Sequence, residues 1–526
     1  MRLKTLPIFL AFLVMGVADA MGPMSKAAKE AYGISTVMAK LLPFFVFIAF
    51  AAFSVPGGLL AARIGKKKLL VTGLALNTVA VVVPTLMVPS FPLLLACIFL
   101  LGIGTTFLQV AGNPIMRDVS AEGAYSRNLA FAQGIKGIGS FGSTALLALV
   151  AAIPFLAARE WRGAFPVYLI LMVLTLISVS SLKIEEAKAD VPPSIGSSLG
   201  LLTEPVFALA VLGIFLYVGA EVCMTSSLES QLNGVGLLGD YGNYLGPTAF
   251  LIALTVGRLV AGSVNVSART FFRLSATLGL VGILLILTSN KMLTVAGAIL
   301  GGLGFANIWP MLFAITVEEK PERASELSGL MCMAISGGAL VPLLMAGTLD
   351  KCTNQFVVGS QVTQATSGAT GTVSSWDKSS STLVIKSLSG SFNGADVISQ
   401  STPSAASARP VVLGWTVDLH AGQFETNSTV TQATSGATGK VVGWDMSSSM
   451  LVIKPLSGSF NGTDVISQSS PAPASATPVT PNFKVVATNG AIAFAVPAAC
   501  FAYLLLLSLK GGKKPAAPAP APATAA

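Results

Sequence analysis

Three ionisable side chains lie within long apolar stretches, where a charge is costly. They are Asp19 in GVADAMGP, Lys136 in AFAQGIKGIGS and Glu221 in YVGAEVCM. Ionisable groups inside a membrane segment mark ion and substrate routes and proton relays. The single histidine, His420, lies far from any apolar stretch. We therefore expect Asp19 to be the proton-coupling carboxylate, with Glu221 as the second candidate.

Amide and aromatic side chains accompany these charges at helical spacing. Three pairs lie three or four residues apart, so each pair shares one helix face: Gln109 with Asn113, Gln133 with Lys136, and Tyr217 with Glu221. Such groups can hydrogen-bond to a sugar and stack on it, and Asn307 and Trp309 offer the same chemistry further along the chain. The alternative is that the amides only join helices, at about 1 kcal/mol each.

Lys136 and Glu221 carry opposite charges, and an isolated charge in an apolar site neutralises or finds a partner. In one interpretation they form an ion pair that only holds two halves of the protein together. In the other, the pair borders a central cavity and breaks as substrate or proton binds. Arg258 is less informative, because near a helix end its long side chain can reach the membrane interface.

The composition excludes several classes of protein. Of 526 residues, 53% are hydrophobic and 10% are charged, whereas soluble domains carry about 25% charged residues. The net charge of +9 comes from short basic runs between apolar segments, so we expect no nucleic-acid partner. Four of the five cysteines lie in apolar segments, which argues against a disulfide framework. The chain has no metal-ligand cluster, nucleophile–base pair or phosphate loop, so we expect neither an enzyme nor a cofactor.

Long apolar segments must position these side chains. A helix needs about 20 mainly apolar residues to cross a bilayer. Twelve such spans are predicted, as six, a charged linker and six: Leu6–Met24, Leu41–Ala62, Leu69–Val88, Pro92–Ile115, Ala130–Ala151, Ala164–Val179, Pro205–Ser226, Tyr244–Val264, Ser275–Leu287, Leu293–Val317, Leu327–Gly347 and Val486–Leu509. The fold class is therefore all-α integral membrane protein, with two six-helix bundles and a small β-rich insert.

The domain organisation follows from these spans. The predicted units are a first bundle (1–182), a cytoplasmic linker (183–200), helices seven to eleven (201–350), the insert (351–484), helix twelve (485–510) and a disordered tail (511–526). With the N-terminus inside, short inner loops and termini carry seventeen Lys and Arg and outer loops carry six. The positive-inside rule then places both termini in the cytoplasm of a multi-pass inner-membrane protein. The first span also reads as a signal peptide, and its cleavage would leave eleven spans.

The two halves of the membrane region resemble each other. Spans four and five read LGIGTTFLQVAGNPIMRD and SRNLAFAQGIKGIGSFGS, and spans ten and eleven read GGLGFANIWPMLFAIT and ASELSGLMCMAISGGALVP. Each pair is a glycine-rich helix with an Asn and a Pro, a short charged loop, and a second helix of small residues. Close packing alone could explain the glycines. The recurrence favours a duplicated transport core.

The segment 351–484 differs in character from the rest. A near-identical repeat of about 40 residues starts at Val362 and again at Val430, 68 residues later. Each copy contains a strand (SSTLVIK or SSMLVIK) and turns (SGATG, NGAD or NGTD), so each is predicted to form a small β unit. By topology the insert lies in the outer loop between spans eleven and twelve. It is either inert or a displayed module.

Several runs, in order and on the expected helices, resemble the fucose–galactose–glucose:proton symporter family of major facilitator transporters. They are Asp19 in the first span, Gln109–Pro114, Arg127–Gln133, Tyr217–Glu221, Ile308–Pro310 and the glycine- and base-rich loop Gly58–Lys68. The resemblance covers the chain apart from the insert and tail. It implies a monomeric secondary transporter that rocks around a central site and imports a hexose or deoxyhexose with a coupling cation.

The departures from that family are informative. Its second carboxylate, on span four, is here Gln109, its asparagine on span five is Lys136, and its glutamine on span seven is Glu221. The acid normally found in the loop after span two is Ala62. Lys136 could therefore recognise an anionic sugar acid as a positive point charge. A further alternative is a receptor or adhesin that displays the β repeats on a transporter that no longer transports.

Overall fold

The computed structural model gives the arrangement of most of the chain. The residues it describes are 6–34, 36–150, 153, 156, 159–184, 186, 193–235, 248–352, 356–364, 366–377, 382–390, 392, 397–401, 406–446, 449–457, 460, 464–487 and 490–509. The predicted disordered tail 511–526 and the side chain of Cys352 lie outside this description.

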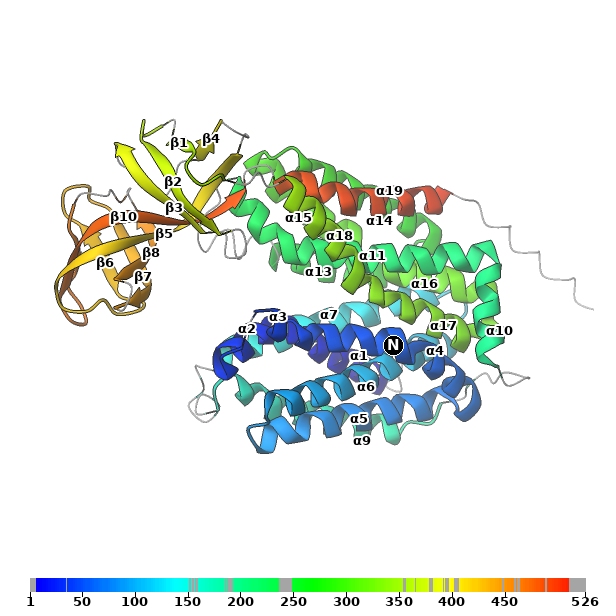
Figure 1. The fold of residues 1–526 in the computed structure, drawn as a ribbon. Helices are drawn as coiled ribbons and strands as arrows, with labels where there is room; N and C mark the ends of the chain where they lie inside the picture. The colour runs from blue at the N-terminus through cyan, green and yellow to red at the C-terminus, as the bar shows by residue number, and fades with distance from the viewer. Residues whose placement is uncertain are drawn as a thin grey trace, which may run out of the picture.

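The membrane region consists of two helical halves that lie side by side, with the β region beyond one end (Figure 1). The first half contains α1 (Leu6–Met15), η2 (Gly16–Ala20), α2 (Met21–Tyr32), α3 (Thr36–Ala39), α4 (Leu41–Ile64), α5 (Lys66–Leu86), α6 (Phe91–Asp118), α7 (Tyr125–Leu149), η4 (Glu160–Gly163) and α9 (Ala164–Ser180). The linker forms α10 (Ile195–Gly200) and η5 (Leu201–Thr203).

In the second half, two of the predicted spans are interrupted. It contains α11 (Pro205–Gly234), α13 (Ala249–Ser263), α14 (Ala268–Leu287), α15 (Lys291–Ala306), α16 (Ile308–Glu319), η7 (Pro321–Arg323), α17 (Ala324–Met333), η8 (Ala334–Ser336), α18 (Gly337–Cys352), η9 (Gly490–Phe494) and α19 (Ala495–Leu509). Span ten thus divides into α15 and α16 at Asn307, and span eleven divides at η8.

Nine helical segments of the described chain are long and apolar enough to cross a membrane, and α1–η2 and α13 are shorter apolar helices. The structure therefore supports a multi-pass helical membrane protein, while the twelve-span topology remains a prediction. α7 has 25 residues but is rich in small and polar ones. The predicted start of span eight, Tyr244, falls outside the described residues. The first segment packs into the helical core, where Phe12 and Met15 are fully buried.

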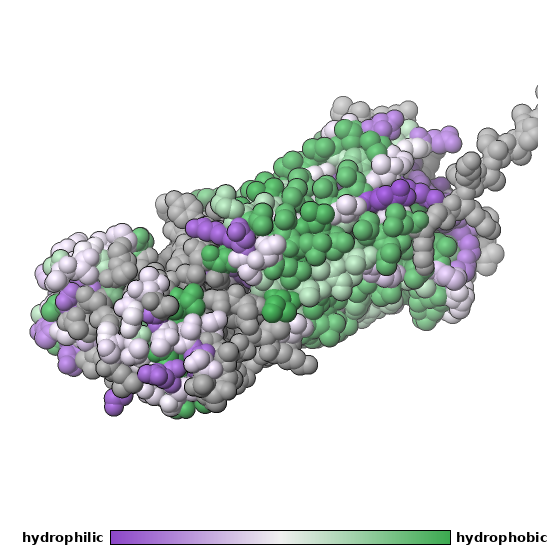
Figure 2. Space-filling model, turned by 90° about the horizontal axis from the view of Figure 1, so that it is seen from above, coloured by the Kyte–Doolittle hydropathy of each residue, from purple (hydrophilic) through white to green (hydrophobic). Residues whose placement is uncertain are grey.

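The surface of the helical body is apolar. Figure 2 shows a broad hydrophobic face over the helices, with hydrophilic patches towards its ends. Large side chains are exposed on outer helices, such as Leu174 and Ile177 on α9 and Leu343 on α18. A water-soluble domain would bury residues of this kind, so lipid is their natural environment.

The insert forms one closed β barrel in the order β1-β2-β3-β10-β9-β6-β7-β8-β5-β4. Its strands are β1 (Gln361–Gln364), β2 (Thr370–Asp377), β3 (Thr382–Ser389), β4 (Ile398–Gln400), β5 (Ala406–Ala421), β6 (Thr429–Gln432), β7 (Thr438–Asp445), β8 (Met450–Ser457), β9 (Ile466–Gln468) and β10 (Ala474–Ala487). The strands of the two repeats are therefore present, as predicted.

The prediction of two separate β units is wrong, because each copy completes the other. The long strand β5, which follows the first copy, pairs with β8 of the second, with Trp415 opposite Leu451. In the same way β10, which follows the second copy, pairs with β3 of the first, with Phe483 opposite Leu383. All four side chains are fully buried in one shared core. Each described strand is paired on both sides in the closed barrel, whereas a single copy would leave sheet edges unpaired.

Candidate functional site

A break in the first span carries Asp19. The chain changes from α-helix to the 3₁₀ turn η2 at Gly16, and Asp19 lies in that turn. Gly139 of α7 packs so closely here that a Cβ on it would lie 2.0 Å from the Leu13 carbonyl oxygen. This approach brings the same turn of α7, with Lys136 and Ser140, against the break.

Asp19 is bonded twice to α7. The Ser140 hydroxyl donates a hydrogen bond to Asp19 Oδ2 at 2.5 Å, and Lys136 Nζ lies 4.0 Å from the same oxygen. The side chain of Asp19 is 49% exposed and that of Lys136 is 19% exposed. Both groups are therefore within reach of a solute or a proton from solution.

The expected pairing of Lys136 with Glu221 is wrong. In the part of the chain that the structure describes, the ion pair of Lys136 is with Asp19, and none joins it to Glu221. Sequence reasoning missed this because Asp19 and Lys136 are 117 residues apart, and only the packing of α1 and η2 on α7 makes them neighbours. The one available signal was that Lys136 has replaced a neutral residue of the family.

Two predicted amides lie where α6 crosses α7 of the same half and α17 of the other half. Gln133 Nε2 donates to Asn113 Oδ1 at 3.2 Å, and Asn113 Nδ2 lies 4.0 Å from Cys332 Sγ on α17. One turn earlier on each helix, the Ser328 hydroxyl donates to the Val110 carbonyl at 2.8 Å. Asn113 thus forms part of the contact between the two halves.

Three other predicted residues carry a buried polar atom that has no hydrogen-bond partner in the protein: Gln109 Oε1, Asn307 Oδ1 and Trp309 Nε1. Their residues are only 2–4% exposed. Such atoms are rare, and each costs about 1–3 kcal/mol. They come from α6 of the first half and from the break in span ten of the second. Two acceptors and one donor of this kind suit the hydroxyl groups of a sugar.

The second half has its own charged group, centred on Arg258 of α13. Arg258 Nη2 donates to the Tyr217 hydroxyl at 3.1 Å, and Arg258 Nε donates to the Ala306 carbonyl at 3.0 Å. Glu221, one turn along α11, interacts electrostatically with the Tyr217 hydroxyl. Arg258 is 7% exposed, so the expectation that it extends to the membrane interface is wrong. Tyr217, predicted to contact substrate, is 1% exposed.

The halves are tightly closed on the side that carries the linker, which we call the linker side. A Cβ on Gly58 of α4 would lie 2.6 Å from the Ser325 carbonyl oxygen of α17. At a second contact between the halves, a Cβ on Gly137 of α7 would lie 2.7 Å from Thr255 Oγ1 of α13. At both contacts a glycine lets two helices cross closely. Asp19, by contrast, remains half exposed. The central groups are therefore shielded from the linker side.

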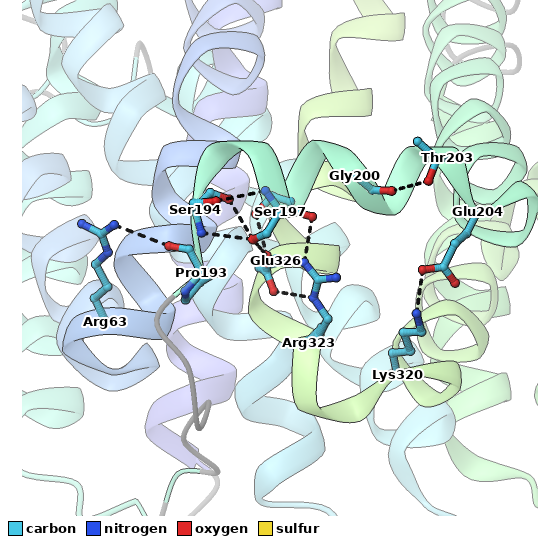
Figure 3. A network of polar contacts seen from close by, with 11 residues as sticks. Arg63, Pro193, Ser194, Ser197, Gly200, Thr203, Glu204, Lys320, Arg323 and Glu326 are labelled. Atoms are coloured by element: carbon cyan, nitrogen blue, oxygen red, sulfur yellow. Dashed lines mark hydrogen bonds and ion pairs between the residues drawn. The ribbon is translucent and has the colours of Figure 1, made fainter.

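The linker reinforces this closure (Figure 3). Glu326 of α17 accepts hydrogen bonds from the Ser197 and Ser198 hydroxyls of α10, at 3.1 and 2.8 Å. The same carboxylate is held by Arg323 through two bonds of 2.7 Å, and Arg63 Nη2 of the first half donates to the Pro193 carbonyl at 3.4 Å. We call these contacts the linker latch.

A carboxylate of the linker itself takes the place of the acid that is missing at Ala62. Glu186 accepts hydrogen bonds from the backbone N–H groups of Lys66 and Lys67, at 2.6 and 2.8 Å, where α5 begins. Backbone N–H groups at a helix start lack partners within the helix and attract anions. The Lys66 ammonium in turn pairs with Asp118 at 2.5 Å. Among the described residues, no group of three His, Cys, Asp or Glu side chains could hold a metal ion.

Comparisons with known proteins agree with this arrangement. The sequence signature of the Major Facilitator Superfamily matches residues 8–342, which end before the insert. A glucose/galactose transporter of Brucella abortus is 25% identical over 338 residues, covering 61% of this chain and 81% of that protein. A putative glucose/galactose transporter of Helicobacter pylori is 24% identical over 336 residues, covering 58% and 80%.

Solved structures share the fold of the helical part. The transporter FucP, in its outward conformation, matches with a TM-score of 0.58 and 16% identity, over 67% of this chain and 93% of that one. The proton:xylose symporter XylE matches with a TM-score of 0.52 and 14% identity, over 66% and 88%.

Proposed function

The chain belongs to the Major Facilitator Superfamily, a family of transporters rather than enzymes, and we propose that it imports a neutral sugar together with a proton by alternating access. The relatives named as glucose/galactose transporters and the fold shared with a fucose:proton symporter support this class of solute. In this mechanism the two halves rock around a central site that opens to one side at a time.

The observation that carries the proposal is the Asp19–Lys136 pair at the break in the first span. It joins a proton-accepting carboxylate and a hydrogen-bond donor in a half-exposed position. The orphaned atoms of Gln109, Asn307 and Trp309 supply further contacts for sugar hydroxyls from both halves.

The same pair favours a neutral sugar over a sugar acid. Lys136 is balanced by Asp19, so this part of the site has no net charge when Asp19 is ionised. An anionic solute would have to displace Asp19 from Lys136, or bind only when Asp19 is protonated. The importer of an anionic sugar acid is therefore the second candidate.

Uptake into proteoliposomes tests the proposal. An imposed pH gradient should drive accumulation of one of glucose, galactose and fucose, and matched sugar acids should neither accumulate nor compete. Accumulation of a sugar acid would replace the first candidate by the second. If none of these solutes is taken up, the receptor or adhesin is favoured. Asp19 and Lys136 would then have no role in transport. A sodium gradient in the same vesicles distinguishes the coupling ion.

The twelve-span topology, with both termini cytoplasmic and residues 351–484 outside an inner membrane, belongs to this proposal. It assigns the linker side to the cytoplasm, so the half-exposed Asp19 faces the outer side in this conformation. Single cysteines in Lys66–Lys68 and in the β barrel should then be labelled from opposite sides of the membrane.

A further inference from the structure

We propose that Arg258 is a positioning residue for transport, which fixes the sugar-facing wall of the second half by tying span seven to the break in span ten. The inference rests on the proposed function of the central site. It concerns a residue outside the group of Asp19 and Lys136, and it assigns Tyr217 to a second role, as a partner of Arg258 rather than of the sugar.

The break in span ten leaves backbone groups that need hydrogen-bond partners. α15 ends at Ala306, Asn307 has φ −110° and ψ 4°, and α16 begins at Ile308. A helix that stops inside the membrane leaves carbonyl groups without intrahelical partners, and no water is available there to satisfy them. Arg258 Nε donates to the Ala306 carbonyl at 3.0 Å. Asn307 Nδ2 returns a bond of 3.2 Å to the carbonyl of Gly257. Two consecutive residues of α13 thus hold two consecutive residues at the break.

The other arm of the Arg258 guanidinium reaches span seven. Nη2 donates to the Tyr217 hydroxyl at 3.1 Å, and that hydroxyl also interacts with Glu221. One planar cation therefore connects α11, α13 and the junction of α15 with α16. A lysine has a single nitrogen and cannot hold Tyr217 and Ala306 in the fixed geometry of the guanidinium fork.

The bond from Arg258 to the Ala306 carbonyl lies next in sequence to the polar atoms that could bind the sugar. The two orphaned atoms of the second half, Asn307 Oδ1 and Trp309 Nε1, lie one and three residues after the carbonyl that Arg258 holds. Their direction depends on where α15 stops and how α16 starts. The side-chain nitrogen of Asn307 is bonded to α13. Its side-chain oxygen is therefore the polar atom that remains for a ligand. Arg258 therefore acts on the sugar through the break, without touching it.

The test compares Arg258→Lys with Tyr217→Phe, and uses Arg269→Lys as the matched control. Arg269 makes an exposed ion pair with Glu319 on the neighbouring element. Sugar uptake gives KM and the maximal rate, and thermal unfolding in detergent gives stability. We expect Arg258→Lys to raise KM about tenfold, the effect of one lost hydrogen bond to a charged group, and to change the maximal rate much less. Tyr217→Phe should add little in the Arg258→Lys background, since both variants break the same contact.

Hydrogen exchange of the purified protein gives a readout that does not depend on transport. Arg258→Lys should speed amide exchange at residues 303–311 and leave α4 to α6 unchanged, whereas Arg269→Lys should not. A wild-type KM in Arg258→Lys, or a lower unfolding temperature with unchanged KM, would mean that Arg258 only stabilises the fold. If the wild-type protein takes up no sugar, the proposed function fails, and unchanged exchange at the break would then overturn the role of Arg258 separately.

Discussion

Each half of the membrane region contains one charged group near its centre, and the two groups are built differently. In the first half, Asp19 and Lys136 are partly exposed and lie 4.0 Å apart. In the second half, Arg258 is buried and is held by Tyr217 and the Ala306 carbonyl. Exposed ion pairs contribute about 0–1 kcal/mol, whereas a hydrogen bond to a charged group contributes about 1.5–3 kcal/mol.

This difference separates a part that can change from a part that stays fixed. A pair that costs little to open can release its carboxylate to a proton at each transport cycle. A buried guanidinium that is hydrogen-bonded to two neighbouring elements keeps them in place through the same cycle. We therefore propose that coupling depends on the first half and positioning on the second.

The largest expected effect comes from removing the titratable carboxylate of the first half. Asp19→Asn keeps the shape and can still accept a hydrogen bond from Ser140, but it cannot take up a proton. We expect accumulation driven by a pH gradient to fall to the level reached without a gradient, while sugar exchange between the two sides continues. Gradient-driven uptake and counterflow in one vesicle preparation measure both.

Glu221→Gln is the matched variant in the second half. If Asp19→Asn still concentrates sugar in response to an imposed proton gradient, coupling does not depend on Asp19. Loss of accumulation in Glu221→Gln alone would then reverse the assignment of the two halves.

A smaller effect is expected from the linker latch, which holds the two halves together on the linker side. Glu326→Gln weakens the bonds to Arg323 and removes an ionised acceptor for Ser197 and Ser198. Opening of the linker side should become more frequent. Cys332 is fully buried beneath this closure, so a membrane-permeant thiol reagent should label it several-fold faster in the variant.

Two further variants control that measurement. Cys332→Ser in the Glu326→Gln background identifies the labelled thiol, and Glu319→Gln removes an exposed carboxylate outside the latch. Equal labelling of Cys332 with and without Glu326→Gln would show that the latch does not hold the linker side closed.

A double-mutant cycle tests which charges meet. Replacement of Asp19 and of Lys136 by Ala should be non-additive in the free energy of unfolding, with a coupling energy of about 0.5–1 kcal/mol for a partly exposed pair. Lys136→Ala and Glu221→Ala should be additive, because no ion pair joins them in the described structure. Coupling in the second cycle and not in the first would mean that Lys136 changes partner between conformations.

The smallest effect is expected from the insert. The helical core and the barrel core are separate clusters, and the length of a surface loop adds to its closure entropy only logarithmically. Replacing residues 351–484 by a short Gly/Ser linker should leave uptake near the wild-type value. Removing only one repeat copy is the contrasting variant, since it exposes sheet edges and should lower the yield of folded protein. Loss of uptake in the complete replacement, with membrane insertion intact, would give the barrel a part in transport.

Much of this protein follows from local sequence. The apolar segments place α4, α5, α6 and α14, because burial in lipid requires long apolar helices whatever their neighbours are. The strands of the insert follow from alternating residues and turn sequences in each copy. The sequence also singles out Gln109, Asn307 and Trp309 as polar residues of the apolar segments, and their contact with a sugar is a proposal.

The tertiary structure decided which of these residues meet. Lys136 pairs with Asp19 because glycines let α1 and η2 approach α7, and Arg258 turns inward because the break at Asn307 frees a carbonyl that needs a donor. The two repeat copies close one barrel because each long strand finds its partner in the other copy. Sequence determines the type and local conformation of each segment, through hydrophobicity and backbone preference. Partners far apart in the chain are chosen by packing, which depends on all segments at once.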